Sequence, residues 1–235
     1  MFSERCLYCH GKKEQAVSWT ALFWKGESDL LCGACKAKLM VIHGDICSMC
    51  SRPLDELDSK FIEGDRCLDC VRWEKDSNWS GCLDKNIALY SYNDFLKELL
   101  SRYKFRGDYV LAKIFAVQLQ TKIKRAAPDL IVPIPLSSER LYERGFNQSE
   151  ALIIEVNHTP SHLLERIHTE KQSKKSRDER IHLQQVFKIT DTDTIASKKI
   201  LLIDDIYTTG STLRHAGKIL KQAGATQVQS LTIAR

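Results

Sequence analysis

Short apolar runs alternate with amphipathic segments from residue 87 onward, and this pattern predicts an α/β domain. Segments rich in apolar and β-branched residues, typical of strands, occur at residues 87–92, 130–136, 200–203 and 228–233. Apolar residues recur at helical spacing over residues 95–103, 109–124, 151–155 and 213–222. The β-α-β succession predicts a parallel sheet flanked by helices on both faces.

The first 82 residues are characterised by paired cysteines and not by apolar runs. Two C-x-x-C pairs can hold one Zn²⁺ in a tetrahedral site, and metal stabilises segments too small for a core of their own. We therefore expect a double zinc ribbon with two structural zinc ions over residues 1–82, and the α/β domain over residues 86–235. Eight of the nine cysteines form four such pairs: Cys6/Cys9, Cys32/Cys35, Cys47/Cys50 and Cys67/Cys70.

The spacing leaves the partners of these pairs open. Sequential pairing gives loops of 22 and 16 residues, and interleaved pairing of first with third and second with fourth also fits. Four pairs without a surrounding βαβ pattern disfavour a redox role. Cys82 is left over and is expected to be a packed thiol, and His10 is expected to lie outside the ligand set.

Charge and hydropathy indicate which domain would attract nucleic acid and in which compartment the protein is expected. Residues 1–85 carry 12 Lys and Arg against 14 Asp and Glu, whereas residues 86–235 carry 23 against 16. Electrostatic attraction for nucleic acid is therefore expected mainly in the second domain. No run of eighteen apolar residues and no signal-peptide layout is present. We expect a cytoplasmic protein without membrane insertion, in which metal ligation is favoured over disulfides.

Residues 200–212 carry the strongest functional signal. An apolar strand leads into Asp204 and Asp205, and a hydroxyl-rich turn then precedes a helix. Paired carboxylates suit the two hydroxyls of a ribose, and a glycine turn at a helix N-terminus suits a phosphate. The stretch resembles the signature by which type I phosphoribosyltransferases bind phosphoribosyl diphosphate (PRPP). The resemblance implies that the 5-phosphate contacts Thr208, Thr209, Gly210, Ser211 and Thr212.

This stretch also fits two other interpretations. An apolar strand followed by two acids is also typical of P-loop ATPases, but no G-x-x-x-x-G-K-[ST] motif accompanies it. Aspartates at a strand end also serve as ordinary helix caps. Two acids and four hydroxyls around one glycine favour the ligand site.

Residues 132–148 form a second functional stretch. A strand that runs into prolines must stop, so we expect a rigid loop that contains Pro135 and Leu136. Arg140 and Arg144 are spaced to face one way on a helical turn, near the carboxyl ends of the strands. Their planar guanidinium groups suit a diphosphate. The alternative is a pair of solvated arginines that neighbour glutamates.

Residues 166–187 are polar, rich in both charges and without periodicity. A long basic loop of this kind is a candidate lid that closes on an anionic substrate, with Arg166, Arg177 and Arg180 among its bases. A solvent-exposed linker is the alternative.

The densest basic region covers residues 97–125, with aromatic residues Tyr103, Phe105 and Tyr109 among its bases. Stacking combined with phosphate neutralisation binds single-stranded DNA without sequence choice. The alternative is a solvated helix whose aromatic residues belong to the core. The eight bases are Lys97, Arg102, Lys104, Arg106, Lys113, Lys122, Lys124 and Arg125.

Together these motifs resemble the ComF/GntX family over essentially the whole chain. The paired C-x-x-C knuckles, Tyr-Lys-Phe-Arg-Gly-Asp at 103–108, Val-Pro-Ile-Pro-Leu with Arg-Gly-Phe-Asn-Gln, and the Asp204 loop occur in the family's order. The family's lid pattern appears as Thr169, Gln172 and Arg180, with Leu183 in place of a usual Asn. The resemblance implies a double zinc ribbon joined to a type I phosphoribosyltransferase-like domain.

The resemblance also implies what the chain does. Family members act in DNA uptake during natural transformation with a helicase-like partner, ComFA. If the domain is an enzyme, it transfers phosphoribosyl from PRPP to an acceptor with Mg²⁺ bound, and Asp204 and Asp205 hold the ribose diol. The alternative is a module that binds PRPP or a nucleotide and single-stranded DNA without chemistry, because fold does not fix function.

Overall fold

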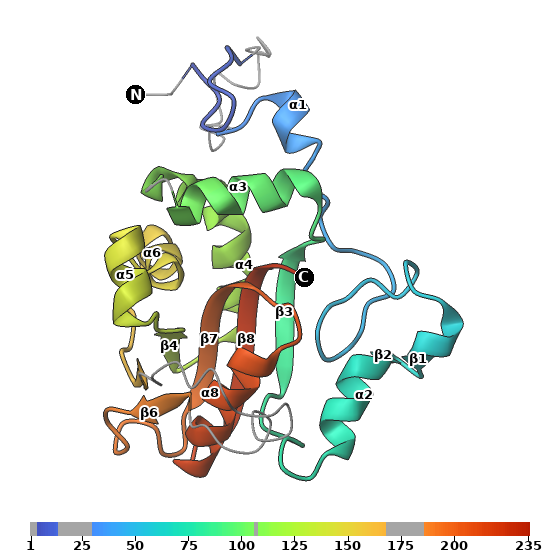
Figure 1. Ribbon diagram of the computed structural model, residues 1–235, viewed down its shortest axis with the longest axis vertical. Helices are drawn as coiled ribbons and strands as arrows, with labels where there is room; N and C mark the ends of the chain where they lie inside the picture. Colours follow the sequence, from blue (N-terminus) through green and yellow to red (C-terminus); the bar gives the residue numbers. More distant parts are fainter. Residues whose placement is uncertain (1–3, 14–29, 106–107, 168–185) are drawn as a thin grey trace, which may run out of the picture.

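The computed structural model describes residues 4–13, 30–105, 108–167 and 186–235. A four-stranded sheet forms its centre, in the order β3-β8-β7-β4, and all neighbouring strands run parallel (Figure 1). The predicted parallel sheet flanked by helices is confirmed. Its strands are β3 (Lys85–Tyr90), β4 (Leu130–Pro133), β7 (Lys199–Ile206) and β8 (Gln227–Ala234).

Alternate residues of the strands fill two separate cores. In β7, Leu201 and Ile203 belong to one core, while Ile200 and Leu202 belong to the other, because successive side chains of a strand point to opposite faces. The second core is covered by α8 (Ser211–Gln222), which lies in front of the sheet in Figure 1. The first core is covered by α3 (Asp94–Phe105), η3 (Tyr109–Phe115), α4 (Ala116–Ala126) and α6 (Gln148–Glu155).

Two expected elements differ from the sequence prediction. The helix expected over residues 109–124 begins as a 3-10 helix, η3, and becomes α-helical only at Ala116. Apolar residues spaced three and four apart fit both helix types, so the pattern does not separate them. The strand expected over residues 130–136 ends at Pro133, since proline cannot donate to the sheet.

The segment expected as one loop over residues 166–187 begins and ends in strands. β5 (Leu164–Arg166) pairs antiparallel with β6 (Phe187–Ile189). Both contain buried residues, Leu164 and Phe187, which join the core beneath α8. The chain between them, residues 168–185, lies outside the described residues.

Local caps explain how the chain turns after β4. Ser137 accepts a hydrogen bond from the amide of Arg140 and begins α5 (Ser138–Arg144), and Gly145 ends it with a φ of 75°. Such left-handed backbone favours glycine. Asn147 then accepts hydrogen bonds from the first amides of α6 and donates to the carbonyl of Ile134. These caps fix two short helices beside the carboxyl end of β4.

The cysteine-rich region covers the open edge of β3. The amide of Ile42 donates to the carbonyl of Leu89 (3.1 Å), and the amide of Asn86 donates to the carbonyl of Met49 (2.7 Å). An edge strand covered in this way no longer presents unpaired backbone groups. The region contains α1 (Gly33–Lys36), η2 (Ser59–Phe61), β1 (Ile62–Glu63), β2 (Arg66–Cys67) and α2 (Leu68–Lys75).

The two halves of this region pack on different parts of the molecule. Cys6 and Cys35 form a small cluster against Phe95 and Ile114, so the first half lies on α3 and η3. The second half joins the core beneath α8. A boundary between residues 82 and 86 stays a prediction. Across the described ranges, no helix has both the length and the hydropathy to span a bilayer.

Candidate functional site

The acid pair lies at the end of the buried strand β7. The strand continues through Asp204 and Asp205 to Ile206, and Asp204 lies opposite Thr232 of β8. Asp205 is buried and Asp204 is half-buried. The two acids thus belong to the carboxyl edge of the sheet, where open α/β folds bind ligands.

The turn after β7 is shaped by Tyr207 and Gly210. Gly210 has a φ of 80° and precedes the first residue of α8. A Cβ at this position would lie 2.1 Å from the Tyr207 hydroxyl, so the tyrosine packs under the turn and leaves room only for glycine. Thr208 and Thr209 are exposed, and Ser211 and Thr212 are half-buried in the first turn of α8. The predicted phosphate loop therefore presents its hydroxyls at a helix N-terminus.

Lys104 and Ser149 contact the acid pair from two other elements. Lys104, near the end of α3, forms an ion pair with Asp205, and both side chains are largely buried. The Ser149 hydroxyl, in the first turn of α6, donates to Asp204 Oδ1 at 3.4 Å. The Asp205 amide donates to the same oxygen at 2.9 Å. The acids thus join α3, α6 and β7 at one point.

Burial and nearby cations set the protonation of the site. Burial raises the pKa of Asp204 to about 6, although Lys104, the Ser149 hydroxyl, Arg166 and Arg144 oppose the shift. Burial also lowers the pKa of Lys104 to about 8, which Asp204 partly offsets. At neutral pH the lysine is still mostly protonated, and Asp204 is mostly ionised.

Arg144 from the predicted diphosphate loop and Arg166 from the predicted lid lie near Asp204. Arg140 and Arg144 lie on α5, Arg166 ends β5, and the pKa of Arg166 is lowered by burial and by the charge of Arg140. Arg144 is held by the side chain of Gln148 at 2.8 Å. Pro135 and Leu136 are half-buried between β4 and α5. Gln172, Arg177 and Arg180 lie outside the described residues.

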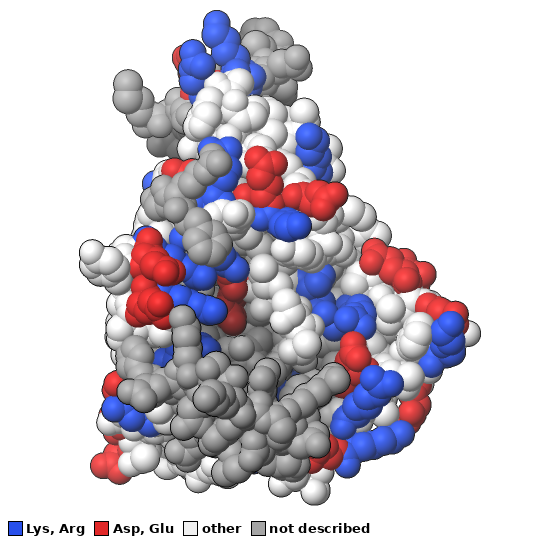
Figure 2. Space-filling model, viewed as in Figure 1, with Lys and Arg blue, Asp and Glu red and all other residues white. Residues whose placement is uncertain are grey.

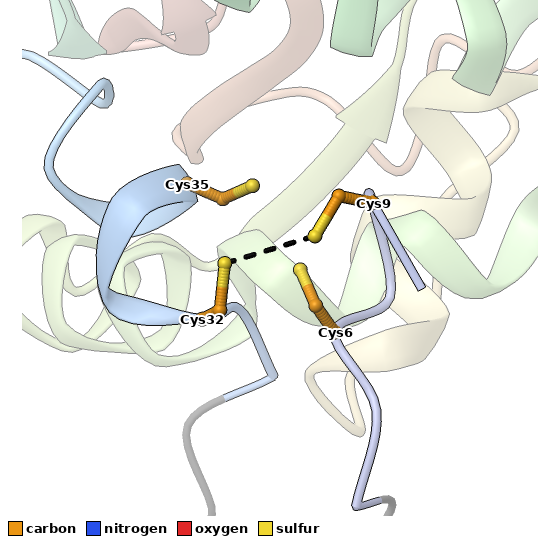
Figure 3. A group of neighbouring side chains, drawn as sticks. All are labelled: Cys6, Cys9, Cys32 and Cys35. Carbon is orange, nitrogen blue, oxygen red and sulfur yellow. Dashed lines mark hydrogen bonds between the residues drawn. The ribbon is translucent and has the colours of Figure 1, made fainter. Parts of the chain in front are cut away.

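The eight C-x-x-C cysteines form two groups by sequential pairing. Cys6, Cys9, Cys32 and Cys35 bring their sulfurs within 4.8 Å of one another, as do Cys47, Cys50, Cys67 and Cys70. Figure 3 shows the first group, with two cysteines on each of two chain segments that face a common centre. Sequential pairing is therefore the arrangement in the structure, and His10 lies outside both groups.

The distances between sulfurs fit zinc. Cys9 and Cys32 are 3.7 Å apart at Sγ, as are Cys50 and Cys67. Four thiolates about 2.3 Å from a tetrahedral Zn²⁺ are separated by roughly 3.8 Å. Both groups can hold a structural zinc ion. Cys82 is buried apart from them, as expected of a packed thiol.

Comparison with known proteins identifies the family. A family model described as "Phosphoribosyl transferase domain" matches residues 144–235. The chain is 39% identical over 234 residues to "Competence protein ComFC" of Bacillus subtilis (strain 168), covering 98% of this chain and 94% of that protein. The chain belongs to the ComFC family.

Other relatives extend this result. "Competence protein ComFC" of Streptococcus pneumoniae (strain ATCC BAA-255 / R6) is 35% identical over 98% of this chain and 100% of its own length. "DNA utilization protein YhgH" of Salmonella typhi is 27% identical over 87% of this chain and 96% of its own length. The ComFC family thus accounts for both the cysteine region and the phosphoribosyltransferase-like domain.

The basic region of this ComFC-family chain is divided between two environments. Tyr103 is fully buried and Lys104 pairs with Asp205, so neither presents a surface to a nucleic acid. Arg102 donates to the carbonyl of Tyr8 and lies over its ring, which ties α3 to the cysteine region. Figure 2 shows acidic as well as basic side chains over α5 and α3 on this face. Among the bases of this region that the structure describes, the exposed ones are Lys97, Lys113, Lys124 and Arg125.

Three contributors to the site are not apparent from the sequence. Lys104 lies in the Tyr-Lys-Phe-Arg-Gly-Asp motif. Because many bases neighbour it in the sequence, it was expected on the DNA-binding surface and not at the acid pair. Asn147 caps α6, which leaves the Ser149 hydroxyl in the first turn free to donate to Asp204. Gln148 supports Arg144. The position of a motif at the end of an amphipathic helix was the available signal for Lys104.

Metal content is the first prediction. Because each cysteine group offers four thiolates, elemental analysis of protein purified under reducing conditions should give close to two zinc ions per chain. Cys82→Ser should keep this number, since Cys82 lies outside both groups. Loss of one ion in Cys82→Ser would contradict the ligand assignment.

The raised pKa of Asp204 predicts how stability depends on pH. Because the pKa is about 6 in the folded protein and near 4 in the unfolded chain, the folded state binds the proton more tightly. The contribution of Asp204 to stability should therefore fall as pH rises from about 4 to above 6.

Asp204→Asn removes this penalty and should raise the free energy of unfolding above pH 7 by about 2–3 kcal/mol, with little change near pH 4. Urea unfolding at several pH values measures it. Asp193→Asn, on an exposed turn, is the control. Equal stability of Asp204→Asn and the parent at both pH values would refute the assignment.

Proposed function

We propose that the chain binds PRPP together with Mg²⁺ and that this binding serves DNA uptake in competent cells. The ComFC-family relatives and the phosphoribosyltransferase family model support a role in competence. The observation that carries the proposal is the meeting of the acid pair, the Gly210 turn and a cluster of cations at one sheet edge.

Each part of PRPP has a matching group at this edge. Two acceptor carboxylates, Asp204 and Asp205, suit the two ribose hydroxyls. The N-terminus of α8 and its hydroxyls suit the 5-phosphate. Lys104, Arg144 and Arg166 lie near Asp204, Arg140 lies near Lys104 and Arg166, and these cations suit the diphosphate. At this edge, carboxylates lie beside cations and a helix N-terminus. This arrangement fits a ligand whose diol lies between two anionic groups.

The same groups support phosphoribosyl transfer. The bond from the anomeric carbon to the diphosphate breaks, the diphosphate leaves with the bonding electrons, and an acceptor nucleophile bonds to that carbon. The carboxylates favour the positive charge that develops on the ribose, and the cations favour the leaving diphosphate. A chain that binds PRPP without this step would be a scaffold. Measuring whether diphosphate is released distinguishes a scaffold from an enzyme.

Mg²⁺ fits the donor set at this edge. Asp204 and Asp205 supply hard carboxylate oxygens, and PRPP would supply its own phosphate oxygens, the mixture that Mg²⁺ prefers. When bound, the ion would neutralise charge on the diphosphate. The chain's own cations hold and orient the same group.

Single-stranded DNA is proposed to bind the exposed side of η3 and α4. Lys113, Val117, Thr121 and Lys124 recur at spacings of three and four, and all are exposed. Arg125 adds a further exposed base at the end of α4. A ComFA-like helicase is proposed as the partner that hands over the strand. This surface is more basic than the acidic cysteine region.

The acid pair gives the PRPP prediction. Asp204→Asn and Asp205→Asn each remove one charge-assisted acceptor, worth about 1.5–3 kcal/mol, so the affinity for PRPP should fall at least about tenfold. Calorimetric titration with PRPP, with and without Mg²⁺, measures the change. The parent should bind PRPP only weakly without Mg²⁺.

Controls separate ligand loss from unfolding. Asp205→Asn leaves Lys104 buried without its counter-ion, so circular dichroism must verify the fold. Asp193→Asn makes the same charge change on an exposed turn and should bind PRPP like the parent. Parent protein that fails to bind PRPP with Mg²⁺ would overturn the proposal. Diphosphate release with a panel of acceptors then tests transfer.

The DNA surface gives a separate prediction. Replacing Lys113, Lys124 and Arg125 with Gln should weaken binding of single-stranded DNA and reduce the slope of log affinity against log salt by about 2. Fluorescence anisotropy across a salt series measures both. The control replaces Lys60, Arg66 and Lys75, three ion-paired bases of the cysteine region, with Gln. Equal losses in both triple variants would place the DNA elsewhere.

A further inference from the structure

Two side chains outside the proposed PRPP site hold the turn after β7. Arg235 Nη1 donates to the carbonyls of Thr208 (2.9 Å) and Tyr207 (3.4 Å). Trp73 Nε1, from α2, donates to the carbonyl of Thr209 (2.9 Å). Three consecutive carbonyls of the turn are therefore taken by donors from the second cysteine half and from the residue that follows β8.

This arrangement determines where the amides of the turn point. In a trans peptide, the N–H of the next residue points away from the carbonyl, and the structure has no cis peptide among its described residues. The amides of Thr208, Thr209 and Gly210 consequently face the opposite side. None of the hydrogen bonds among the described residues uses these three amides. Successive free amides beside a helix N-terminus form an anion cradle.

Both holding residues are tied to the second cysteine group. Arg235 Nε donates to Cys50 Sγ at 3.3 Å, and its guanidinium lies 5.0 Å from the centre of the Tyr207 ring. Trp73 lies in α2, which begins directly after Cys67 and contains Cys70. The first cysteine group instead packs against Phe95 and Ile114, away from the turn.

We propose that Arg235 and Trp73 are positioning residues for the 5-phosphate and that metal in the Cys47, Cys50, Cys67 and Cys70 group fixes them. Metal binding keeps Cys50 as a thiolate, which accepts the Arg235 N–H more strongly than a thiol does. Metal bonded to Cys67 and Cys70 would hold α2, and with it Trp73. The identity of the anion rests on the proposed function, whereas the holding of the turn does not.

Arginine suits this position because of its shape. A planar guanidinium carries five N–H donors in a fixed fork, so one side chain can reach a sulfur and two carbonyls together. A lysine offers one nitrogen and cannot span them. Trp73 similarly offers one indole N–H on a rigid ring, which phenylalanine lacks.

The first experiment measures PRPP affinity by calorimetry with Mg²⁺ and excess zinc. Arg235→Lys and Trp73→Phe should each weaken binding by about tenfold while the zinc content stays at two. Arg72→Lys is the matched control, because Arg72 lies on α2 with an exposed side chain that pairs only with Asp69 in the described residues. It should bind PRPP like the parent.

The second experiment compares the two metal groups. Cys50→Ser should weaken PRPP binding at least about tenfold more than Cys9→Ser, since only the second group contacts the holding residues. If Cys50→Ser does not fold, Arg235→Lys and Trp73→Phe carry the test. Equal losses in the two cysteine variants would overturn the link to metal.

Hydrogen–deuterium exchange without PRPP reports the turn directly. The peptide that covers residues 204–214 should exchange faster in Arg235→Lys and Trp73→Phe than in the parent and in Arg72→Lys. Parental exchange together with parental PRPP affinity in both variants would overturn the inference. Faster exchange in a protein whose parent binds no PRPP would support the holding role and reject PRPP as the anion.

Discussion

Burial of β7 on both faces is the constraint on which the rest of the structure depends. Its alternate residues belong to two different cores, so a shift of one residue would exchange the two sets of side chains. The register with β8 is therefore fixed along the strand, from Lys199 opposite Gln227 to Ile206 opposite Ala234. The acids near its end, and the turn that follows, are positioned by packing well below the site.

The charges at the end of β7 illustrate a compromise between stability and binding. Asp204 is buried enough to raise its pKa, and Lys104 is buried enough to lose part of its own affinity for a proton. Neither shift helps the free protein to fold. Groups held in such an environment are ready for a ligand that supplies hydroxyls and phosphates, and natural sites often carry this cost.

The sequence predicted the elements that depend on local pattern. Apolar runs indicated the strands, and apolar residues at helical spacing over residues 151–155 and 213–222 indicated α6 and α8. The sequence did not separate a 3-10 helix from an α-helix over residues 109–115, because both satisfy the same apolar spacing. It also could not show Lys104, Trp73 and Arg235 at the site. Trp73 and its partner Thr209 are 136 residues apart along the chain, and Arg235 joins Cys50, 185 residues away, to Thr208. Contacts between segments that are distant along the chain produce no periodic pattern in the sequence.

The position of β8 has a consequence for the order of folding. It is the last strand along the chain, yet it lies between β3 and β7 in the sheet. During synthesis, β3 and β7 therefore have no direct pairing with each other and wait with open edges until β8 arrives. Pairings of such long sequence separation form slowly and leave strands exposed to aggregation in the meantime. The cysteine segment covers the other edge of β3, so the edge that faces β8 is the one left open on this strand.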